Sequence, residues 1–391
     1  MIINTEVKNF KTIKEYSFEF KNLNILTGIN GTGKSSLIQA LLCLRQTYLE
    51  KENFDSLLLK DKSGVLKIGT GKDVLNTERE PIGFPISIKL NFKNKKESFF
   101  CYDYLRKEES GDMYKNLNSL RKNELSSIDM EIIKQSLFLR NDNFHYVSAD
   151  RIGPSEEYLL SDNVKQFQEI GHRGEFAVHY LNEYKSKAVE NKFVLHEKTK
   201  EGKYFLENQI SLWLSEIMSG VKISTSLNEN GTRAYADYTV GESIKFKPAN
   251  IGFGVSYVLP VILALLTAKV GGTVIIENPE SHLHPRGQSK MAELIARCAA
   301  SGVQIFIETQ SDHIITGIMI AAREYFKAKK ENRTATNGIS HDDVAIYYFS
   351  RENESNSSKV ERVNLSETGK IPYPPAGFFD QFNIDMKRLL K

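Results

Sequence analysis

Cysteine and long apolar runs are both scarce in this 391-residue chain. Its three cysteines, Cys43, Cys101 and Cys298, are far apart in the sequence and form no CxxC pair. This pattern argues against a disulfide framework and predicts a reducing, cytoplasmic location. The most apolar run, 255–270, contains Pro260 and is shorter than the roughly 20 residues that cross a bilayer. We therefore predict a buried helix there and no association with a membrane.

The sequence also lacks an excess of one charge. It has 52 lysines and arginines against 49 aspartates and glutamates, for a net charge of +3. This balance argues against a dedicated polybasic protein but leaves room for a local basic patch. The opening MIINTEVKNF lacks the apolar core of a secretion signal. The length suggests either a large α/β domain with an insertion or two domains.

Hydrophobic patterning divides the chain into three segments. Residues 1–105 hold short β-rich runs, and PISIKLNF and ESFFCYDYL around KNKK predict a hairpin. Residues 106–245 form an expected helical and β insertion, with highly charged helical spacing over 106–141. Residues 246–391 alternate helix and strand, which predicts a parallel sheet, and end in a hairpin of VAIYYFS and SKVERVNL. We expect an N-terminal lobe, an insertion and a C-terminal lobe.

A phosphate-binding loop follows the apolar strand LNILTG. GINGTGKSS matches the pattern G-x-x-x-x-G-K-[ST], and a helical segment comes directly after it. Glycines let the backbone approach phosphate, and amides at the helix start face the anion. Lys34 should neutralise β- and γ-phosphate charge, and Ser35 should bind Mg²⁺. The predicted nucleotide-binding residues are Gly28, Asn30, Gly31, Thr32, Gly33, Lys34, Ser35 and Ser36.

A second acidic strand end occurs in TVIIENPESHLHP. Glu277 follows four apolar or β-branched residues, at the carboxyl edge where nucleotides bind in parallel sheets. It is a candidate to hold the water shell of Mg²⁺. His282 and His284 with two glutamates would alternatively suggest zinc, but H-x-H spacing is a weak signal without a third ligand.

Together these motifs resemble the ABC-type ATPase heads of the SMC, RecF and OLD (overcoming lysogenization defect) group. ANIGFGVSYVLPVILALL falls where the group has its signature motif, and IFIETQSDHII falls at its switch segment. The ENPE motif and YPPAGFFDQ resemble a subfamily of bacterial defence-associated AAA-type ATPases. The resemblance implies an α/β P-loop NTPase fold of ABC-head type. That fold has a mixed or parallel sheet, an N-terminal antiparallel β-subdomain and a helical insertion.

The resemblance also implies a mechanism and partners. Two heads pair around two ATP molecules, each held by the P-loop of one copy and the signature helix of the other. ATP binding closes the pair and hydrolysis opens it. ATP and Mg²⁺ are the implied cofactors, and a homodimer or higher oligomer is the implied assembly. The signature residues would be Gly252, Gly254 and Ser256.

The catalytic positions depart from the group's pattern. Glu277 stands in place of aspartate, Asn278 in place of the catalytic glutamate and Gln310 in place of the switch histidine. An amide orients water but does not accept its proton, and losing a general base costs ~10²–10⁴-fold in rate. Glu280 either compensates or caps the following segment. The expected catalytic residues are Lys34, Glu277, Asn278, Glu280 and Gln310.

Three weaker signals remain open. Phe253 falls on the signature serine, so Ser256 either replaces that serine or is a first-turn helix residue. The hairpin-tip lysines Lys93, Lys95 and Lys96 are either a solvated turn or a nucleic-acid contact. Arg151 either reaches phosphate or pairs with Asp150 or Glu156.

Three functions are therefore compatible with the sequence. The first is a slow, ATP-dimerised ATPase that serves as sensor or regulatory subunit in bacterial phage defence or genome maintenance. The second is a nucleotide-gated scaffold with negligible hydrolysis that holds an effector. The third is a DNA-stimulated clamp ATPase. The chain shows no second catalytic motif, so a separate effector, such as a nuclease or toxin, is the expected partner.

Overall fold

The described chain folds into two compact units. Unit 1 comprises residues 1–21, 26–140 and 347–362, and unit 2 comprises 22–25, 141–346 and 363–391. The computed structural model describes residues 1–60, 64–76, 78, 85–103, 119–135, 143–241, 245–250, 252–333, 337–351 and 355–390.

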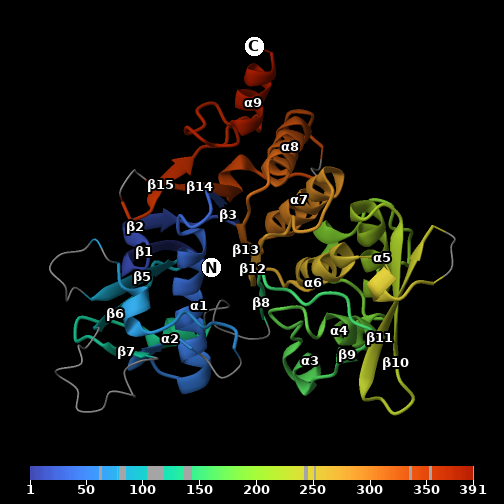
Figure 1. Cartoon of the computed structure of the whole chain (residues 1–391), viewed down its shortest axis with the longest axis horizontal. Helices are drawn as coiled ribbons and strands as arrows, with labels where there is room; N and C mark the ends of the chain where they lie inside the picture. Colours follow the sequence, from blue (N-terminus) through green and yellow to red (C-terminus); the bar gives the residue numbers. More distant parts are fainter. Residues whose placement is uncertain are drawn as a thin grey trace. The chain divides into compact units, whose positions relative to one another are not determined.

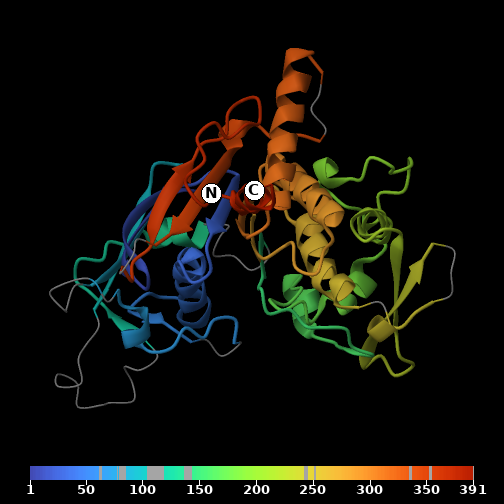
Figure 2. The same ribbon diagram turned by 45° about the horizontal axis from the view of Figure 1, so that its top comes forward.

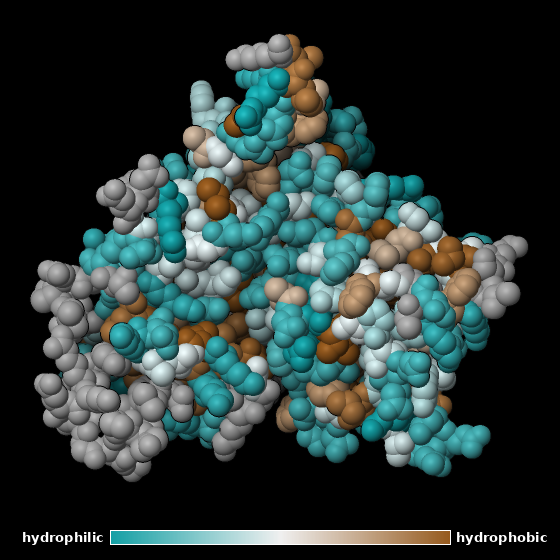
Figure 3. Space-filling model, viewed as in Figure 1, coloured by the Kyte–Doolittle hydropathy of each residue, from teal (hydrophilic) through white to brown (hydrophobic). Residues whose placement is uncertain are grey.

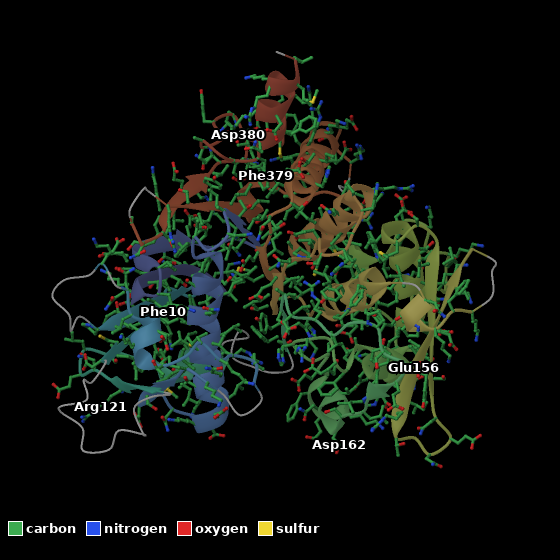
Figure 4. All side chains as sticks on the ribbon, viewed as in Figure 1. Phe10, Arg121, Glu156, Asp162, Phe379 and Asp380 are labelled. Atoms are coloured by element: carbon green, nitrogen blue, oxygen red, sulfur yellow. The ribbon has the colours of Figure 1, made fainter. Side chains whose placement is uncertain are left out.

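Unit 1 is built on a six-stranded antiparallel sheet (Figure 1). Its strands, in spatial order, are β2 (Ile13–Glu19), β1 (Ile2–Phe10), β5 (Ile86–Phe92), β6 (Glu97–Asp103), β7 (Ser119–Lys122) and β4 (Ser56–Leu58). The predicted hairpin around KNKK is confirmed, because β5 and β6 pair from Ile86 opposite Tyr102 onwards. Phe10 is fully buried in this unit, whereas Arg121 of β7 is exposed (Figure 4).

Two further parts of the chain position the P-loop. Helix α1 (Lys34–Lys51) follows β3 (Leu23–Gly28) and buries leucines at helical spacing, including Leu37, Leu41 and Leu44. The end of β3 lies against β14 (Val344–Ser350), since the amide of Ile29 donates to the carbonyl of Phe349 at 3.3 Å. The strand β15 (Lys359–Val363) is the neighbour of β14, which confirms the predicted C-terminal hairpin.

Unit 2 contains the predicted alternation of helix and strand. Its parallel strands are β13 (Gln304–Glu308), β12 (Thr273–Glu277) and β8 (Phe144–Val147), with β12 in the middle. The connecting helices are α6 (Phe253–Thr267), α7 (Pro285–Ala300) and α8 (Asp312–Lys330). Helices α7 and α8 lie side by side in both ribbon views (Figures 1 and 2). The first four residues of β12 are fully enclosed, which leaves Glu277 at its carboxyl end.

Helix α6 is the buried helix predicted for 255–270. A proline inside a helix removes one backbone hydrogen bond and needs space for its ring. The ring of Pro260 occupies the space beside Gly174, where an added Cβ would lie 2.2 Å from Cγ of Pro260. Within the described residues, no helix is both long and apolar enough to span a bilayer.

The rest of unit 2 is a small sheet and its helices. The antiparallel strands β10 (Val221–Leu227), β11 (Arg233–Val240) and β9 (Tyr158–Leu159) lie in that order. The accompanying helices are α3 (Asp162–Phe167), α4 (Ala177–Tyr184) and α5 (Leu206–Ile217). The last described helix, α9 (Gln381–Leu389), exposes apolar side chains such as Phe382 and Leu389. Figure 3 shows hydrophobic surface, in brown, at the top, where this helix lies.

The prediction of helical structure over 106–141 is wrong in part. Residues 119–122 form strand β7 instead, with Arg121 paired opposite Asp103 and Lys122 opposite Tyr102. Pairing with a neighbouring strand overrides local helical spacing there. A short helix, α2 (Met130–Gln135), follows. Residues 104–118 and 136–142 lie outside the described residues.

Candidate nucleotide-binding and hydrolysis site

The P-loop of unit 1 has a backbone that only glycine accommodates at two positions. Gly28 and Gly33 have φ angles of 134° and 102°. A Cβ on Gly28 would lie 2.0 Å from the carbonyl oxygen of Phe349, and one on Gly33 would lie 2.0 Å from Oγ1 of Thr12. The loop therefore packs closely against Phe349 and Thr12 at these two glycines, where any larger residue would clash.

Lys34 lies in the curve of this loop. Its Nζ donates to the carbonyls of Gly28 and Ile29, each at 2.9 Å, and the side chain is 3% exposed. The hydroxyl of Thr32 also donates to Ile29, at 2.7 Å. Helix α1 begins here with no acidic residue in its first turn. The ammonium group of Lys34 is thus fixed at a helix start whose positive partial charge is not offset by an acidic side chain. Such an arrangement favours binding of phosphate oxygens.

The other predicted loop residues lie around this ammonium group. Asn30 and Gly31 are exposed, Ser35 is part-buried in the first turn of α1, and Ser36 is buried. The hydroxyl of Ser36 lies 3.3 Å from that of Thr12. Unit 1 therefore brings together the eight residues predicted for this loop.

Three residues that hold the loop were missed by sequence reasoning. Arg351 donates to the carbonyl of Gly31 at 2.7 Å, and the hydroxyl of Ser358 donates to the carbonyl of Thr32. Ser358 also bonds the hydroxyl of Thr12 at 2.7 Å. These residues are remote in sequence from the loop and carry no motif, so only the sheet pairing reveals them.

Glu277 lies at the end of β12 in unit 2 with both oxygens engaged. Oε1 accepts from the hydroxyl of Tyr146 at 3.1 Å, and Oε2 accepts from the amide of Ala149 at 2.9 Å. Burial raises the pKa of Glu277, and the amide of Ala149 opposes that rise. Sequence reasoning missed Tyr146, although its strand β8 runs parallel to β12 and ends at the same sheet edge.

Asn278, Glu280 and Gln310 line one pocket of about 450 Å³ in unit 2. We call it the strand-end pocket, and its other lining residues are Ser281, Gln288, Ser311, Asp312 and His313. Asn278 has a left-handed backbone with φ of 45°. Its Oδ1 is buried and accepts no hydrogen bond from the described residues.

Glu280 has one capping oxygen and one without a partner. The amide of Gln310 donates to Oε1 at 2.8 Å, so Glu280 caps the segment after β13. Oε2 is buried and accepts no hydrogen bond from the part of the chain that the structure describes. Burial raises the pKa of Glu280, opposed by the amide of Gln310 and the hydroxyl of Thr309. Glu280 thus caps a segment 30 positions away and not the one that follows it, and its second oxygen is left to accept a proton.

Arg151 lies next to the carboxyl end of β12 and is only 2% exposed. Its guanidinium donates to four backbone carbonyls: Ser148 at 3.0 Å, Tyr257 at 3.3 Å, Asn278 at 2.9 Å, and Glu277. The expected pairing with Asp150 or Glu156 is wrong for Asp150, which pairs with Arg173 at 3.1 Å. It is also wrong for Glu156, because backbone carbonyls accept the hydrogen bonds of the Arg151 guanidinium. Burial lowers the pKa of Arg151 to about 10.

The signature segment packs tightly at the start of α6. Gly252 precedes the helix with φ of 84°, and a Cβ on Gly254 would lie 3.0 Å from the carbonyl of His282. Ser256 is 8% exposed in the first turn, and its hydroxyl hydrogen-bonds Tyr158. This arrangement matches the first-turn alternative for Ser256. Phe253 is 55% exposed, and its ring lies 5.8 Å from that of His282.

Metal binding at this site would depend on few protein ligands. The described residues contain no group of three or more His, Cys, Asp or Glu side chains that could hold a metal ion. His284 instead caps α7 by accepting from the amide of Arg286 at 3.3 Å. Mg²⁺ normally retains waters and phosphate oxygens, with one or two protein ligands. Ser35 of unit 1 and Glu277 of unit 2 each carry an oxygen of the kind that Mg²⁺ prefers.

Three sequence families match parts of the chain. Residues 107–316 match the family described as "AAA domain, putative AbiEii toxin, Type IV TA system". Residues 339–389 and 1–57 match families described as proteins of unknown function, DUF3696 and DUF2813. No curated protein matches the chain.

Solved structures of Smc heads are similar to this chain. An Smc head bound to the C-winged helix domain of ScpA has a TM-score of 0.51 and 15% identity, over 94% of this chain and 98% of that one. This likeness confirms the predicted P-loop NTPase fold of ABC-head type. A Pyrococcus furiosus Smc head with an extended coiled coil, bound to the C-terminal domain of ScpA, gives 0.49 at 13% identity, over 100% of this chain and 99% of that one. The head domain from Thermotoga maritima gives 0.44 at 11% identity, over 93% and 99%.

Proposed function

Because the chain belongs to the family described as "AAA domain, putative AbiEii toxin, Type IV TA system", we propose that it is an ATPase that dimerises on ATP and hydrolyses it slowly. It acts as a sensor or regulatory subunit in bacterial phage defence or genome maintenance. The observation that carries this proposal is the buried ammonium of Lys34, held at 2.9 Å by two loop carbonyls at the start of α1.

Each predicted residue has a chemical task in this proposal. Lys34 and the loop amides would bind the β- and γ-phosphates. Ser35 and Glu277 are each a candidate ligand for Mg²⁺, which would neutralise developing phosphate charge. The unpartnered Oδ1 of Asn278 orients the attacking water. Oε2 of Glu280 accepts the proton of that water, and the side chain of Gln310 donates to the departing phosphate.

Slow turnover follows from the nature of Asn278. An amide has no useful basicity at neutral pH, and absence of the normal base costs ~10²–10⁴-fold in rate. Glu280 recovers part of this loss, because burial raises the pKa of its carboxyl and makes it a better proton acceptor once ionised. The hydrogen bond from the amide of Gln310 restricts how far the Glu280 carboxylate can move toward the attacking water.

Phosphate release under multiple turnover with Mg²⁺ and ATP tests the proposal. We expect slow release from the wild type and none above background from Lys34→Ala. Lys51→Ala removes a lysine from the last turn of the same helix and should behave as wild type. Asn278→Glu should raise turnover at least ~10-fold by supplying the missing base. Equal release from wild type and Lys34→Ala would overturn the enzyme assignment.

A nucleotide-gated scaffold is the second candidate, and Asn278 favours it. In this case ATP still pairs two copies, but turnover equals that of Lys34→Ala. The head would hold a separate effector, such as a nuclease or toxin. The Smc head that was solved with a ScpA domain is another head of this fold with a bound protein.

The hairpin tip of unit 1 gives little support to the third candidate function, a DNA-stimulated clamp ATPase. Lys96 pairs with Asp129 at 3.3 Å and with Glu131 at 3.1 Å, so part of the tip charge is already neutralised. DNA stimulation of ATP turnover that is lost when Lys93, Lys95 and Lys96 become glutamate would support this alternative. Unchanged turnover with every nucleic acid would exclude it.

A further inference from the structure

Lysines and exposed aromatic rings occur together in one segment of unit 2, well away in sequence from the motifs above. We call residues 185–205, KSKAVENKFVLHEKTKEGKYF, the lysine–aromatic loop. It holds six lysines against three glutamates, an excess that equals the +3 of the whole chain. Phe193, Tyr204 and Phe205 are 48%, 42% and 41% exposed. A solvated loop has no physical need for three exposed aromatic rings.

The loop is closed and anchored at its base. The amide of Val189 donates to the carbonyl of Tyr204, and that of Leu206 donates to Lys187, both at 2.9 Å. Ala188 and Phe205 form an antiparallel bridge between the two ends. A compact loop with joined ends keeps all its side chains within a small surface area, and such loops are frequently functional.

Buried side chains of α5 and α7 donate hydrogen bonds to the backbone of the loop. Figure 2 shows the loop as the light-green segment beside these helices. Trp213 donates its indole N–H to the carbonyl of Val194 at 2.8 Å. Arg297 donates to the carbonyl of Leu195 at 2.7 Å, and Asn191 donates to Ser301 at 2.8 Å. The exposed rings therefore sit on a fixed support, which lowers the entropy cost of binding.

Among the exposed loop residues that form no ion pair within the described chain, Lys192, Lys200 and Lys203 outnumber Glu197 and Glu201. Lys187 pairs with Glu190 and Lys198 pairs with Glu216. No ion pair involving Lys192, Lys200 or Lys203 is formed among the described residues, and all three are exposed. Three unpaired ammonium groups beside exposed rings suit a ligand that offers both phosphates and flat apolar faces.

We propose that the lysine–aromatic loop binds single-stranded nucleic acid, with lysines on the phosphates and aromatic rings stacked on bases. A duplex covers the base faces that the rings require, so a single strand fits better. A pocket of about 270 Å³ borders the base of the loop, lined in part by Tyr180, Tyr184 and Lys187. This site is independent of ATP turnover.

Fluorescence anisotropy on the full chain tests the proposal, with oligo-dT and oligo-rU of about 16 nucleotides and a matched duplex. We expect tighter binding to the single strands. Changing Lys192, Lys200 and Lys203 to glutamine should reduce the slope of log binding constant against log salt concentration by about 2, at roughly 0.7 per lysine. Phe193→Ala and Tyr204→Ala should each weaken binding ~5-fold or more.

Matched variants separate this surface from general charge. Changing Lys327, Lys329 and Lys330 of α8 to glutamine removes the same charge from an exposed helix end in the same unit and should leave binding unchanged. An equal loss in both triple variants would overturn the proposal. So would no binding at low salt. Loop-dependent binding to phosphatidylserine vesicles without binding to oligonucleotides would instead identify a membrane surface and overturn it. Unchanged melting temperatures exclude misfolding.

Discussion

At the scale of single residues, the proposed role of Glu280 as a proton acceptor opposes the stability of the fold. Burial raises the pKa of Glu280 above that of the unfolded chain. Below the ordinary glutamate pKa the carboxyl is neutral in both states, and folding suffers no penalty from its charge. As pH rises through the raised pKa, the folded chain must bury a charge and loses stability relative to the unfolded chain. A proton acceptor therefore costs stability at neutral pH.

Glu280→Gln separates the two roles left open for this residue. Glutamine keeps an oxygen for the amide of Gln310 but stays neutral, so it should stabilise the chain by about 1 kcal/mol at neutral pH. The gain should vanish at acidic pH, which melting temperatures across pH would detect. If Glu280 is the base, ATP turnover falls at least ~10-fold. Unchanged turnover would leave only the cap. Glu201→Gln, at an exposed position, is the control for the loss of charge.

Arg151 shows why some site residues escape prediction. The sequence places it after a strand end, where charged neighbours suggest an ion pair. In the fold, its guanidinium instead joins carbonyls of β12 and α6, more than 100 positions away, to the end of β8. Backbone carbonyls carry no residue-type signal, so no sequence pattern marks them. The place of Glu277 at a strand end was predictable because nucleotides bind at the carboxyl edge of parallel sheets, whereas Asn278 and Gln310 were identified only through the family resemblance.

At the scale of elements, close packing of α7 and α8 depends on Gly317. A Cβ at this position would lie 2.5 Å from Cβ of Ala292 and 3.2 Å from the carbonyl of Ser289. Gly317→Val should therefore cost about 2 kcal/mol by overpacking, seen as a lower melting temperature. Thr316→Ala, at the exposed position next to it, is the matched control and should change little. Equal melting temperatures for both variants would contradict this packing.

The elements themselves were predictable to different degrees. Helix α6 and strand β12 follow from unbroken apolar runs, and the β5–β6 hairpin follows from the turn between two β-rich segments. Strand β7 was not predictable, since its charged sequence has helical spacing and only the pairing with β6 and β4 makes it a strand. Local periodicity thus predicts buried elements well, whereas an exposed strand at low hydrophobicity depends on its neighbours.

At the scale of the whole molecule, the predicted functional residues belong to different compact units. Lys34 lies in unit 1, and Asn278, Glu280 and Gln310 lie in unit 2. We propose that bound ATP acts as a switch on the chain as a whole, because a ligand shifts an equilibrium between unpaired and paired states only through its differential affinity for them.

ATP-dependent pairing is the prediction that tests this switch. Sedimentation velocity should show a monomer without nucleotide or with ADP, and a dimer with Mg²⁺ and ATP. Lys34→Ala should stay monomeric with ATP, because it lacks the ammonium that holds the phosphates, and Lys51→Ala should dimerise as wild type does. Slow turnover at Asn278 should make the dimer persist after ATP is diluted, whereas Asn278→Glu should shorten its lifetime. A wild-type mass independent of nucleotide would contradict the switch even if phosphate release were observed.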